Sequence, residues 1–376
     1  MPIRTYTFDR ALAGTYLDLC RELYREDTNW IPPARKHLLE QFSPGFGFHR
    51  QAGNAHRHFL ATARGKPVGH VSAIVNSHLR DRDGTTVGAI GFFECVDEPG
   101  IAAELLRSAC DWLRAEHGLR RIWGPMQFDV WHGYRLMTRG FETATFLGEP
   151  YNKSYYPAQF MASGFDVRKR WFSLDVEGTA ALRRLMQPME RDHAQALEDG
   201  YRIDPMDIRS PALVQALHAA LEDSYRDFLG ITRIDLAEFR EIFAGYARGL
   251  DPRFALTAWS PTDELGGFIV AYPDYARALQ ALRSHRSPLA LLRFWLRARS
   301  VERVVGFMVG ITHQESARGR HLGRALTYRC IRSVMEAGFK SMLFALLAED
   351  SRARLFFEGG QFEPRKEYAL YEIDLE

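Results

Sequence analysis

A short apolar run, a basic loop and a helical pattern follow one another between Arg303 and Phe339, and this succession constrains the fold more than any other stretch. The run 304–309 is too short for a helix of its own and is rich in β-branched and aromatic residues, which is typical of a buried strand. From Leu322, apolar residues recur at helical spacing until Gly338, a residue type that often ends helices. The stretch therefore predicts a strand, a loop and a helix packed in layers.

The loop between this strand and this helix is suited to bind a diphosphate. The first turn of a helix leaves backbone N–H groups without partners, and the helix dipole adds partial positive charge there. Gly319 and Gly323 allow the backbone to approach a ligand, and Arg318, Arg320 and Arg324 add full charges. The sequence therefore predicts an anion site at the start of the helix. The alternative is a surface loop whose arginines are solvated.

Residues 317–326, ARGRHLGRAL, resemble the acyl-CoA-binding motif of the GNAT acyltransferases, Arg/Gln-x-x-Gly-x-Gly/Ala, whose loop amides hold the pyrophosphate of coenzyme A. Arg318 and Gly323 match this motif, whereas His321 stands where its first glycine belongs. The resemblance implies acyl-CoA as the co-substrate and no metal. The cofactor-binding residues that it implies are Val309, Gly310, Ile311, Arg318, Gly319, Arg320, His321, Leu322, Gly323 and Arg324.

The composition predicts a soluble cytoplasmic protein, with peripheral attachment at the inner membrane as a further expectation. With 376 residues and 46% hydrophobic content, the chain can bury the cores of two domains. The net charge of +2 gives no global sign of nucleic-acid binding. The four cysteines include no C-x-x-C pair, which fits a reducing compartment, and no stretch has the pattern of a signal peptide or a membrane span.

The second half of the sequence repeats the order of the first. FDVRKRWFSLDVE at 165–177 is similar to FEPRKEYALYEID at 362–374, without a gap, and two further strand patterns recur in the same order. The alternative is that strands of hairpins look alike in any case. We expect an α/β (α+β) fold with two tandem GNAT-like domains, 1–178 and 179–376, each a mostly antiparallel twisted sheet flanked by helices.

The first copy lacks the basic loop. Residues 97–105, DEPGIAAEL, stand where the second copy has ARGRHLGRAL, and their acidic side chains would repel a diphosphate. We therefore expect a degenerate N-terminal domain and one acyl-CoA site in the C-terminal domain.

Acyl transfer from a thioester to an amine requires a polarised carbonyl, a base for the amine proton and often an acid for the thiolate. The resemblance places a backbone amide of residues 308–311 at the carbonyl. Candidate bases are His313 and Glu315, directly after the first strand, and Glu349, after the next strand; each is also compatible with a solvated loop residue. Phe357 occupies the place of the family's usual acid, a tyrosine. Tyr368 or Tyr371 could substitute, but both alternate along a predicted strand, which favours a packing role for them.

Two aromatic-rich loops in the first half, 124–135 and 148–165, predict either a packed seam or an apolar substrate channel. Under the second interpretation Trp131, His132, Tyr155 and Tyr156 are substrate-binding residues. The same loops resemble a bacterial tandem-GNAT branch to which bacterial ceramide synthases are related. This resemblance implies an amine acceptor that is a lipid, with a sphingoid base as the leading example.

Residues 276–301 contain six arginines and no acidic residue, interleaved with Leu, Phe and Trp. Such a basic amphipathic segment is typical of binding to an anionic membrane surface; the alternative is a helix that covers the sheet. We expect an acyl-CoA-dependent N-acyltransferase acting on a long-chain amine, with no nucleic-acid partner. The alternatives are an acyltransferase for a small polar amine and a non-catalytic sensor that binds acyl-CoA.

Overall fold

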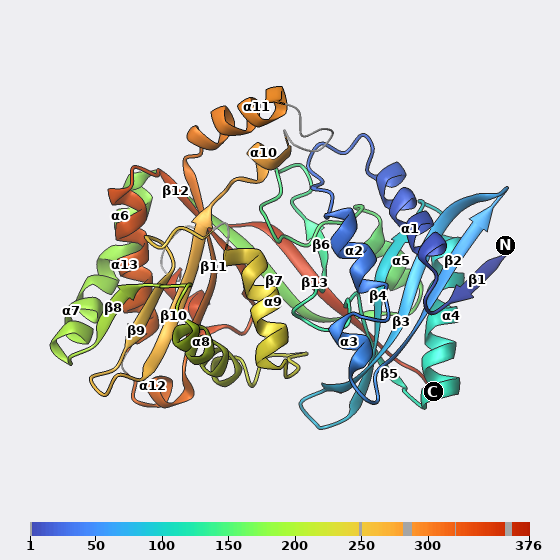
Figure 1. Ribbon diagram of the computed structural model, residues 1–376, viewed down its shortest axis with the longest axis horizontal. Coiled ribbons are helices and arrows are strands. Elements are labelled where there is room, and N and C mark those ends of the chain that lie inside the picture. Colours follow the sequence, from blue (N-terminus) through green and yellow to red (C-terminus); the bar gives the residue numbers. More distant parts are fainter. Residues whose placement is uncertain (1, 248–249, 281–287, 320, 358–362) are drawn as a thin grey trace. The chain divides into compact units, whose positions relative to one another are not determined.

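A computed structural model describes residues 2–247, 250–280, 288–319, 321–357 and 363–376, and Figure 1 labels its helices and strands. The chain divides into two units. Unit 1 comprises Met1–Arg170, Leu229–Thr232 and Glu367–Glu376, and unit 2 comprises Trp171–Phe228 and Arg233–Lys366.

The sheet of unit 1 is antiparallel except for one parallel pair. Its strand order is β1-β2-β3-β4-β5-β13, and β4 and β5 are parallel because α4 connects them. Its elements are β1 (Ile3–Tyr6), α1 (Arg10–Leu23), α2 (Arg35–Gln41), α3 (Gly47–Arg50), β2 (Ala55–Ala63), β3 (Lys66–Arg80), β4 (Thr86–Cys95), α4 (Pro99–His117), β5 (Arg121–Gly124), β6 (Leu136–Arg139), α5 (Tyr156–Ala162), the start of β7 (Asp166–Glu177) and the end of β13 (Pro364–Asp374).

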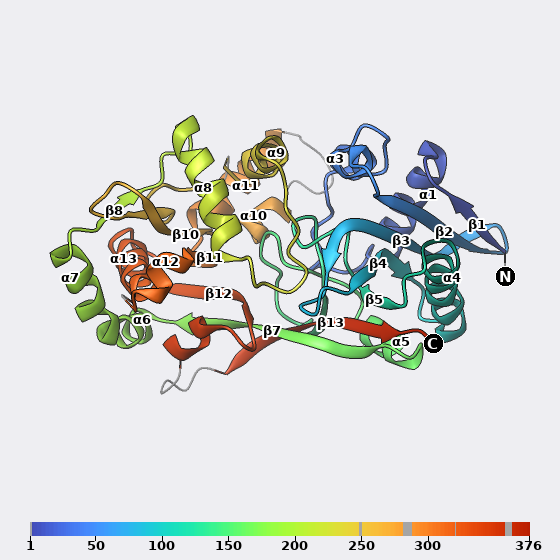
Figure 2. The ribbon, with the colours of Figure 1, turned by 90° about the horizontal axis from the view of Figure 1, so that it is seen from below.

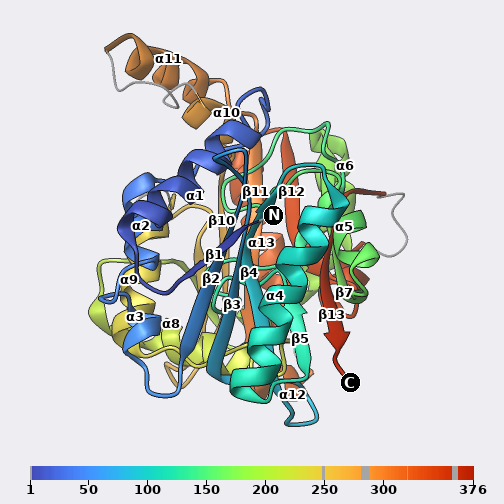
Figure 3. The ribbon, with the colours of Figure 1, turned by 90° about the vertical axis from the view of Figure 1, so that its right-hand side faces the viewer.

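Helices cover both faces of the sheet in unit 1, as Figure 3 shows for α4 and α1. Alternate residues of a strand point to opposite faces. Val71 and Ala73 of β3 therefore pack with Leu105 and Leu113 of α4, in the core of that face. His70, which directly precedes Val71, points to the other face, where its ring packs against the ring of Tyr16 of α1.

The sheet of unit 2 has the order β8-β9-β10-β11-β12-β7, antiparallel except for β11 and β12, which α13 connects. Its elements are α6 (Thr179–Met186), η1 (Gln187–Met189), α7 (Glu190–Glu198), β8 (Arg202–Pro205), α8 (Pro211–Ser224), α9 (Leu236–Ala247), β9 (Leu256–Trp259), β10 (Leu265–Pro273), α10 (Ala276–Leu279), α11 (Pro288–Arg299), β11 (Arg303–Ile311), α12 (His313–Ala317), α13 (Leu322–Glu336), β12 (Ser341–Ala348) and η3 (Arg352–Phe356).

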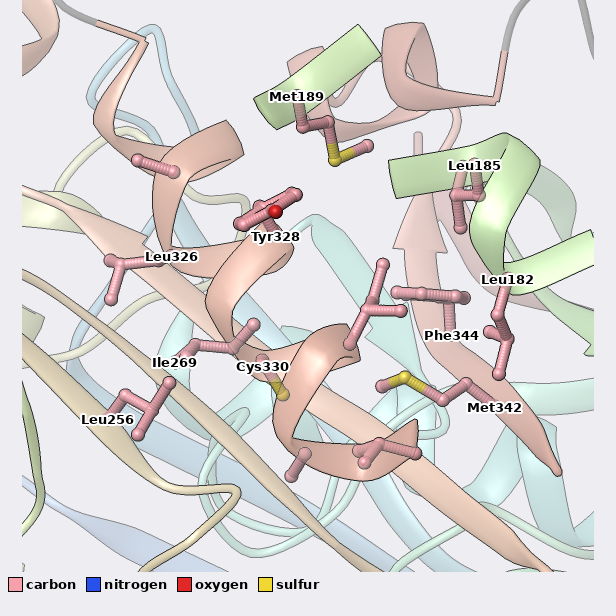
Figure 4. Close-up of a cluster of buried hydrophobic side chains, with 14 of the residues drawn as sticks. Leu182, Leu185, Met189, Leu256, Ile269, Leu326, Tyr328, Cys330, Met342 and Phe344 are labelled. Atoms are coloured by element: carbon pink, nitrogen blue, oxygen red, sulfur yellow. The ribbon is translucent and has the colours of Figure 1, made fainter. Parts of the chain in front are cut away.

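The core of unit 2 lies between its sheet and α13. Figure 4 shows Leu326 and Cys330 of α13 beside Leu256 and Ile269 of the strands, with Met342 of β12 in the same cluster. The helix forms where the apolar spacing predicts it, and Gly338 follows its end with φ 87°, a left-handed conformation that favours glycine. On the sheet, α8 packs against β10 and β11 (Figure 2). The core thus fixes β11 and α13 relative to one another within unit 2.

Each half of the sequence contributes its last strand to the other unit. In unit 2, β12 pairs with β7 from Ser341↔Glu177 to Ala348↔Trp171. In unit 1, β5 pairs with the end of β13, from Tyr371↔Gly124 to Asp374↔Arg121. The compact units therefore do not follow the expected halves 1–178 and 179–376, because both terminal strands are exchanged.

The predicted fold class is confirmed: each unit is a mostly antiparallel sheet flanked by helices. Among the helices within the described ranges, none combines the length and the apolar character needed to cross a bilayer.

Candidate functional site

The parallel strands β11 and β12 of unit 2 separate before they end. Their pairing runs from Arg303↔Ser341 to Gly306↔Phe344, whereas β11 continues to Ile311 and β12 to Ala348. A bulge in each strand accompanies the separation: Phe307 is the extra residue opposite β10, and the register of β12 with β7 shifts between Phe344 and Leu347. The last residues of β11 therefore have backbone groups that β12 does not pair.

Close packing and one hydroxyl group shape this end of β11. A Cβ atom on Gly310 would lie 2.5 Å from two ring carbons of Phe268, so this position requires a glycine. The Tyr225 hydroxyl group, directly after α8, donates a hydrogen bond of 2.9 Å to the carbonyl oxygen of Val309. A tyrosine hydroxyl group thus lies at the strand segment that was predicted to hold the thioester carbonyl.

The loop after β11 contains a short helix, α12, and then leads into α13. Gly319 has φ 66°, a left-handed conformation, and His321 caps α13. The N–H groups of Arg324 and Ala325 donate to the carbonyl oxygen of His321, while the preceding N–H groups belong to the open first turn of the helix. The N-terminus of α13 therefore follows the end of β11 as the motif predicts.

Gly323 is not required by packing within the protein. A Cβ atom at this position would lie 3.4 Å from Cγ1 of Ile311 and 3.8 Å from Cζ of Phe356, which are ordinary van der Waals contacts. A glycine that the fold could replace is consistent with a backbone that a ligand approaches closely.

Arg318 is held by a buried carboxylate. Its Nη1 lies 2.6 Å from Oε1 of Glu315, and the other oxygen of Glu315 accepts a hydrogen bond from the Tyr201 hydroxyl group. Glu315 is 4% exposed, and its Cγ packs where a Cβ on Gly266 would lie. The predicted base Glu315 is thus fully engaged in orienting the loop and Arg318.

The other predicted residues of the loop take different places. Arg324 donates to Oδ2 of Asp192, at 2.6 Å, and to the carbonyl oxygen of Pro188, which ties α13 to α7. Leu322 is buried in the core, whereas His321 is exposed. Arg320 lies outside the described residues. The loop can therefore offer a ligand backbone N–H groups and the side chain of Arg318, whereas the side chain of Arg324 is bound to Asp192 of α7.

The remaining candidate bases, His313 and Glu349, are both exposed residues of unit 2. His313 begins α12; its backbone N–H donates to Oδ2 of Asp223 at 2.5 Å, and its Nε2 lies 3.2 Å from Oδ2 of Asp227. Its side chain is 48% exposed. Glu349 follows β12, is exposed, and its carbonyl oxygen accepts from Arg354 at 3.4 Å. His313 is thus the candidate with both exposure and acidic partners.

The residues considered for the acid are all buried. Phe357, in the place of the family's tyrosine, is buried against Phe344 with the ring centroids 4.9 Å apart. Tyr368 and Tyr371 are in the core of unit 1, because the end of β13 completes the sheet of that unit. Both tyrosines belong to unit 1 rather than to the unit that contains α13.

In unit 1, the corresponding strand end is closed by two of the predicted substrate residues. Tyr156 is 0% exposed; its hydroxyl group donates to Oε2 of Glu94 at 2.7 Å and accepts from the N–H of Cys95 at 2.9 Å. The Tyr155 hydroxyl group donates to the carbonyl oxygen of Cys95 at 2.8 Å. Burial raises the pKa of Glu94 to about 7 and that of Tyr156 well above its usual value. These side chains occupy the end of β4.

Trp131 and His132 are also engaged within unit 1. The indole N–H of Trp131 donates to the carbonyl oxygen of Thr232 at 3.0 Å, and Nδ1 of His132 lies 2.8 Å from Oδ1 of Asp129. No described loop helix separates β4 from α4: only residues 96–98 do, including the acidic Asp97 and Glu98. Unit 1 therefore contains no counterpart of the loop at α12.

Sequence reasoning missed the partners that orient the loop. Tyr201, Asp192 and Asp223 contact residues more than 80 positions away. No motif surrounds them, and only the packing of β8, α7 and α8 brings them to the loop.

No family model matches the chain. In sequence it is 26% identical over 317 residues to bacterial ceramide synthase of Caulobacter vibrioides (strain NA1000 / CB15N), covering 82% of this chain and 80% of that protein. Protein YghO of Escherichia coli (strain K12) is 28% identical over 177 residues, 45% of this chain and 44% of that protein. A solved tandem GNAT protein from the clavulanic acid biosynthesis pathway aligns with a TM-score of 0.52 at 13% identity, over 99% of this chain and 98% of that one.

The chain therefore has the tandem GNAT fold, which confirms the resemblance drawn from the motif and the repeat. Within that class it is a sequence relative of bacterial ceramide synthase. Together the two likenesses support the predicted class of enzyme, an N-acyltransferase.

Proposed function

We propose that this protein transfers an acyl group from acyl-CoA to a long-chain amine, with a sphingoid base as the leading acceptor. The observation that carries the proposal is the separation of β11 from β12 directly before the N-terminus of α13. A strand edge with unpaired backbone groups can bind the amide groups of a pantetheine arm, and a helix N-terminus can bind a diphosphate. The similarity to bacterial ceramide synthase supports the choice of amine.

The diphosphate would lie against the backbone N–H groups of residues 321–323 at the N-terminus of α13, because the N–H of Gly319 already donates to the carbonyl oxygen of Ser316. Arg318 adds one positive charge, and the hydrogen bond that its Nη1 donates to Glu315 orients its guanidinium group. Because Arg324 is bound to Asp192, we assign it to the attachment of α13 rather than to the phosphate.

In the proposed reaction the amine nitrogen attacks the thioester carbon, and a backbone N–H of residues 308–311 stabilises the oxyanion. His313 accepts the proton that the amine nitrogen loses. As the C–S bond breaks, the sulfur leaves as coenzyme A thiolate. The Tyr225 hydroxyl group, which lies at Val309, is the proton donor that we propose in place of the family's tyrosine.

A lipid acceptor would reach the enzyme from a bilayer. The proposal therefore includes peripheral binding to an anionic membrane through the segment 276–301. Residues 281–287 of this segment lie outside the described residues, and the binding is argued separately below from the exposed side chains of α11 (Pro288–Arg299).

A thiol-release assay tests the proposal. Purified protein is supplied with acyl-CoA of several chain lengths and with long-chain or small polar amines, and free coenzyme A is measured. We expect release that depends on a long-chain amine and an N-acylated product by mass spectrometry. Release with small polar amines alone would favour an acyltransferase for soluble amines. Tight acyl-CoA binding without release by any amine would favour a sensor.

A further inference from the structure

Helix α11 (Pro288–Arg299) exposes an unusual amount of apolar surface. Five of the nine large hydrophobic side chains that are exposed in the described part of the protein lie on its 12 residues. These are Leu289, Leu291, Leu292, Trp295 and Leu296, with exposed fractions from 45% to 62%. Scattered single apolar residues are ordinary on a protein surface, but a cluster on one helix indicates a binding face.

The helix contacts its own unit through a different and narrow line of residues. Ala290 is buried, and Phe294 and Ala298 are half-buried. At 3.6 residues per turn these three residues, four positions apart, form one stripe. Figures 1 and 3 show α11 next to the short helix α10. Two of the three residues through which α11 contacts unit 2 are small alanines, whereas Trp295 and the leucines are exposed.

The charges of α11 are all positive. Arg293 and Arg297 lie between the buried stripe and the exposed leucines, and Arg299 lies at the last turn. Nη1 of Arg297 lies 3.4 Å from the carbonyl oxygen of Arg277 in α10, so this arginine lies on the side of α11 that faces α10. The helix sequence contains no acidic residue that could neutralise them.

We propose that α11 lies in the plane of an anionic lipid bilayer, with Leu292, Trp295 and Leu296 in the interface and Arg293 and Arg297 against lipid phosphates. Leucine and tryptophan on one side and arginine at its border are the residues that such helices use. Pairing of α11 with a second copy would bring arginines together without acidic partners. The inference is argued from the exposed side chains of α11. It also extends the proposed function, because a membrane-bound α11 would let a long-chain amine reach unit 2 from the bilayer.

The apolar side of α11 is tested by flotation with vesicles of phosphatidylglycerol and phosphatidylethanolamine. The variant Leu292→Ser/Trp295→Ser/Leu296→Ser should lose at least roughly tenfold in vesicle affinity, since large apolar side chains supply the burial. The control Met161→Ser/Leu197→Ser removes side chains that are 59% and 49% exposed on other helices and should bind like wild type. Because all these residues are exposed, folding should persist.

The basic border is tested with Arg293→Gln/Arg297→Gln. Each arginine near an anionic surface should contribute roughly fivefold, so the double variant should bind about 25-fold more weakly at low salt. The control Arg183→Gln/Arg184→Gln removes two exposed arginines from α6 and the same net charge. Wild-type binding should fall as salt shortens the Debye length from ~30 Å at 0.01 M to ~8 Å at 0.15 M, and phosphatidylcholine vesicles should bind weakly.

Three results would overturn the inference. One is wild-type protein that ignores anionic vesicles at low salt; another is a loss of binding that is equal in the α11 variants and their controls. The third is self-association that only the triple variant abolishes, without vesicle binding, which would assign the face to a second copy. Thiol release with the long-chain amine supplied in detergent micelles and no vesicles should be unchanged in every variant, so a failure of docking is distinguishable from a failure of acyl transfer.

Discussion

The carboxyl group of Glu94 should make the stability of unit 1 depend on pH, and Glu94→Gln should remove that dependence. Burial is the main reason that its pKa rises from 4.5 to about 7, although a hydrogen bond from Tyr156 and the charge of Lys153 partly offset it. The unfolded chain ionises this group near its ordinary pKa, whereas the folded chain keeps the proton longer. The folded state therefore loses free energy of unfolding as the pH rises from about 4.5 to about 7.

The expected size follows from the two pKa values. A rise from 4.5 to about 7 corresponds to about 3 kcal/mol of lost stability at a pH where the group is ionised in both states. A glutamine can still accept the hydrogen bond from Tyr156, but it does not titrate. The free energy of unfolding of Glu94→Gln minus that of the wild type should therefore increase by about 3 kcal/mol between about pH 4.5 and about pH 8.

Equilibrium urea unfolding of both proteins across this pH range measures the difference. Burial lowers the pKa values of His56, His58 and His70, so acid will weaken both proteins, but this contribution cancels in the difference. Glu40→Gln, which changes an exposed glutamate in α2, is the control and should give a constant difference. A pH-independent difference for Glu94→Gln would refute the assignment of a raised pKa.

Three further predictions concern the proposed site. Gly323→Leu should weaken acyl-CoA binding at least roughly tenfold in calorimetry, because the leucine side chain blocks the approach of the ligand to the backbone. The control Gly100→Leu, in open space at the start of α4, should bind acyl-CoA normally. Equal losses of affinity in the two variants would show that the acyl-CoA site lies elsewhere. His321→Gly should keep or raise the affinity with an unchanged pH profile, and strong weakening would show a direct role of the imidazole. Tyr225→Phe should lower kcat about 100-fold with little change in acyl-CoA binding if its hydroxyl group is the acid, and an unchanged kcat would exclude this role.

The elements that could be predicted from the sequence are those with strong local patterns. The strand that became β11 and the helix from Leu322 to Glu336 follow from apolar spacing and from Gly338. The loop between them was expected to be irregular, but residues 313–317 form α12. Its first N–H is bound by Asp223, which lies at the end of α8 and 90 positions earlier in the chain. Local patterns contain no information about such a partner.

The same reasoning explains which features of the site the sequence could indicate. Gly319 has a left-handed backbone conformation, which a glycine reveals in the sequence. Side-chain roles depend on distant neighbours: Arg324 binds Asp192, and Tyr201 and Glu315 bind one another. The place of Tyr368 likewise depends on a distant partner, because the end of β13 pairs with β5 of unit 1.

The strand exchange has a consequence for how the chain matures during synthesis. The unit whose residues leave the ribosome first is not the first that can be finished. One edge of β5 pairs with β4, but the other edge has no partner until β13, which comes after both in the sequence, has been made. Until then Trp123 and its neighbours lie at an open sheet edge, which is a hazard for aggregation. Conversely, β7 is available early to receive β12. The last ten residues of this sequence thus act as the closing step for unit 1, and separate expression of the two sequence halves would leave both sheets incomplete.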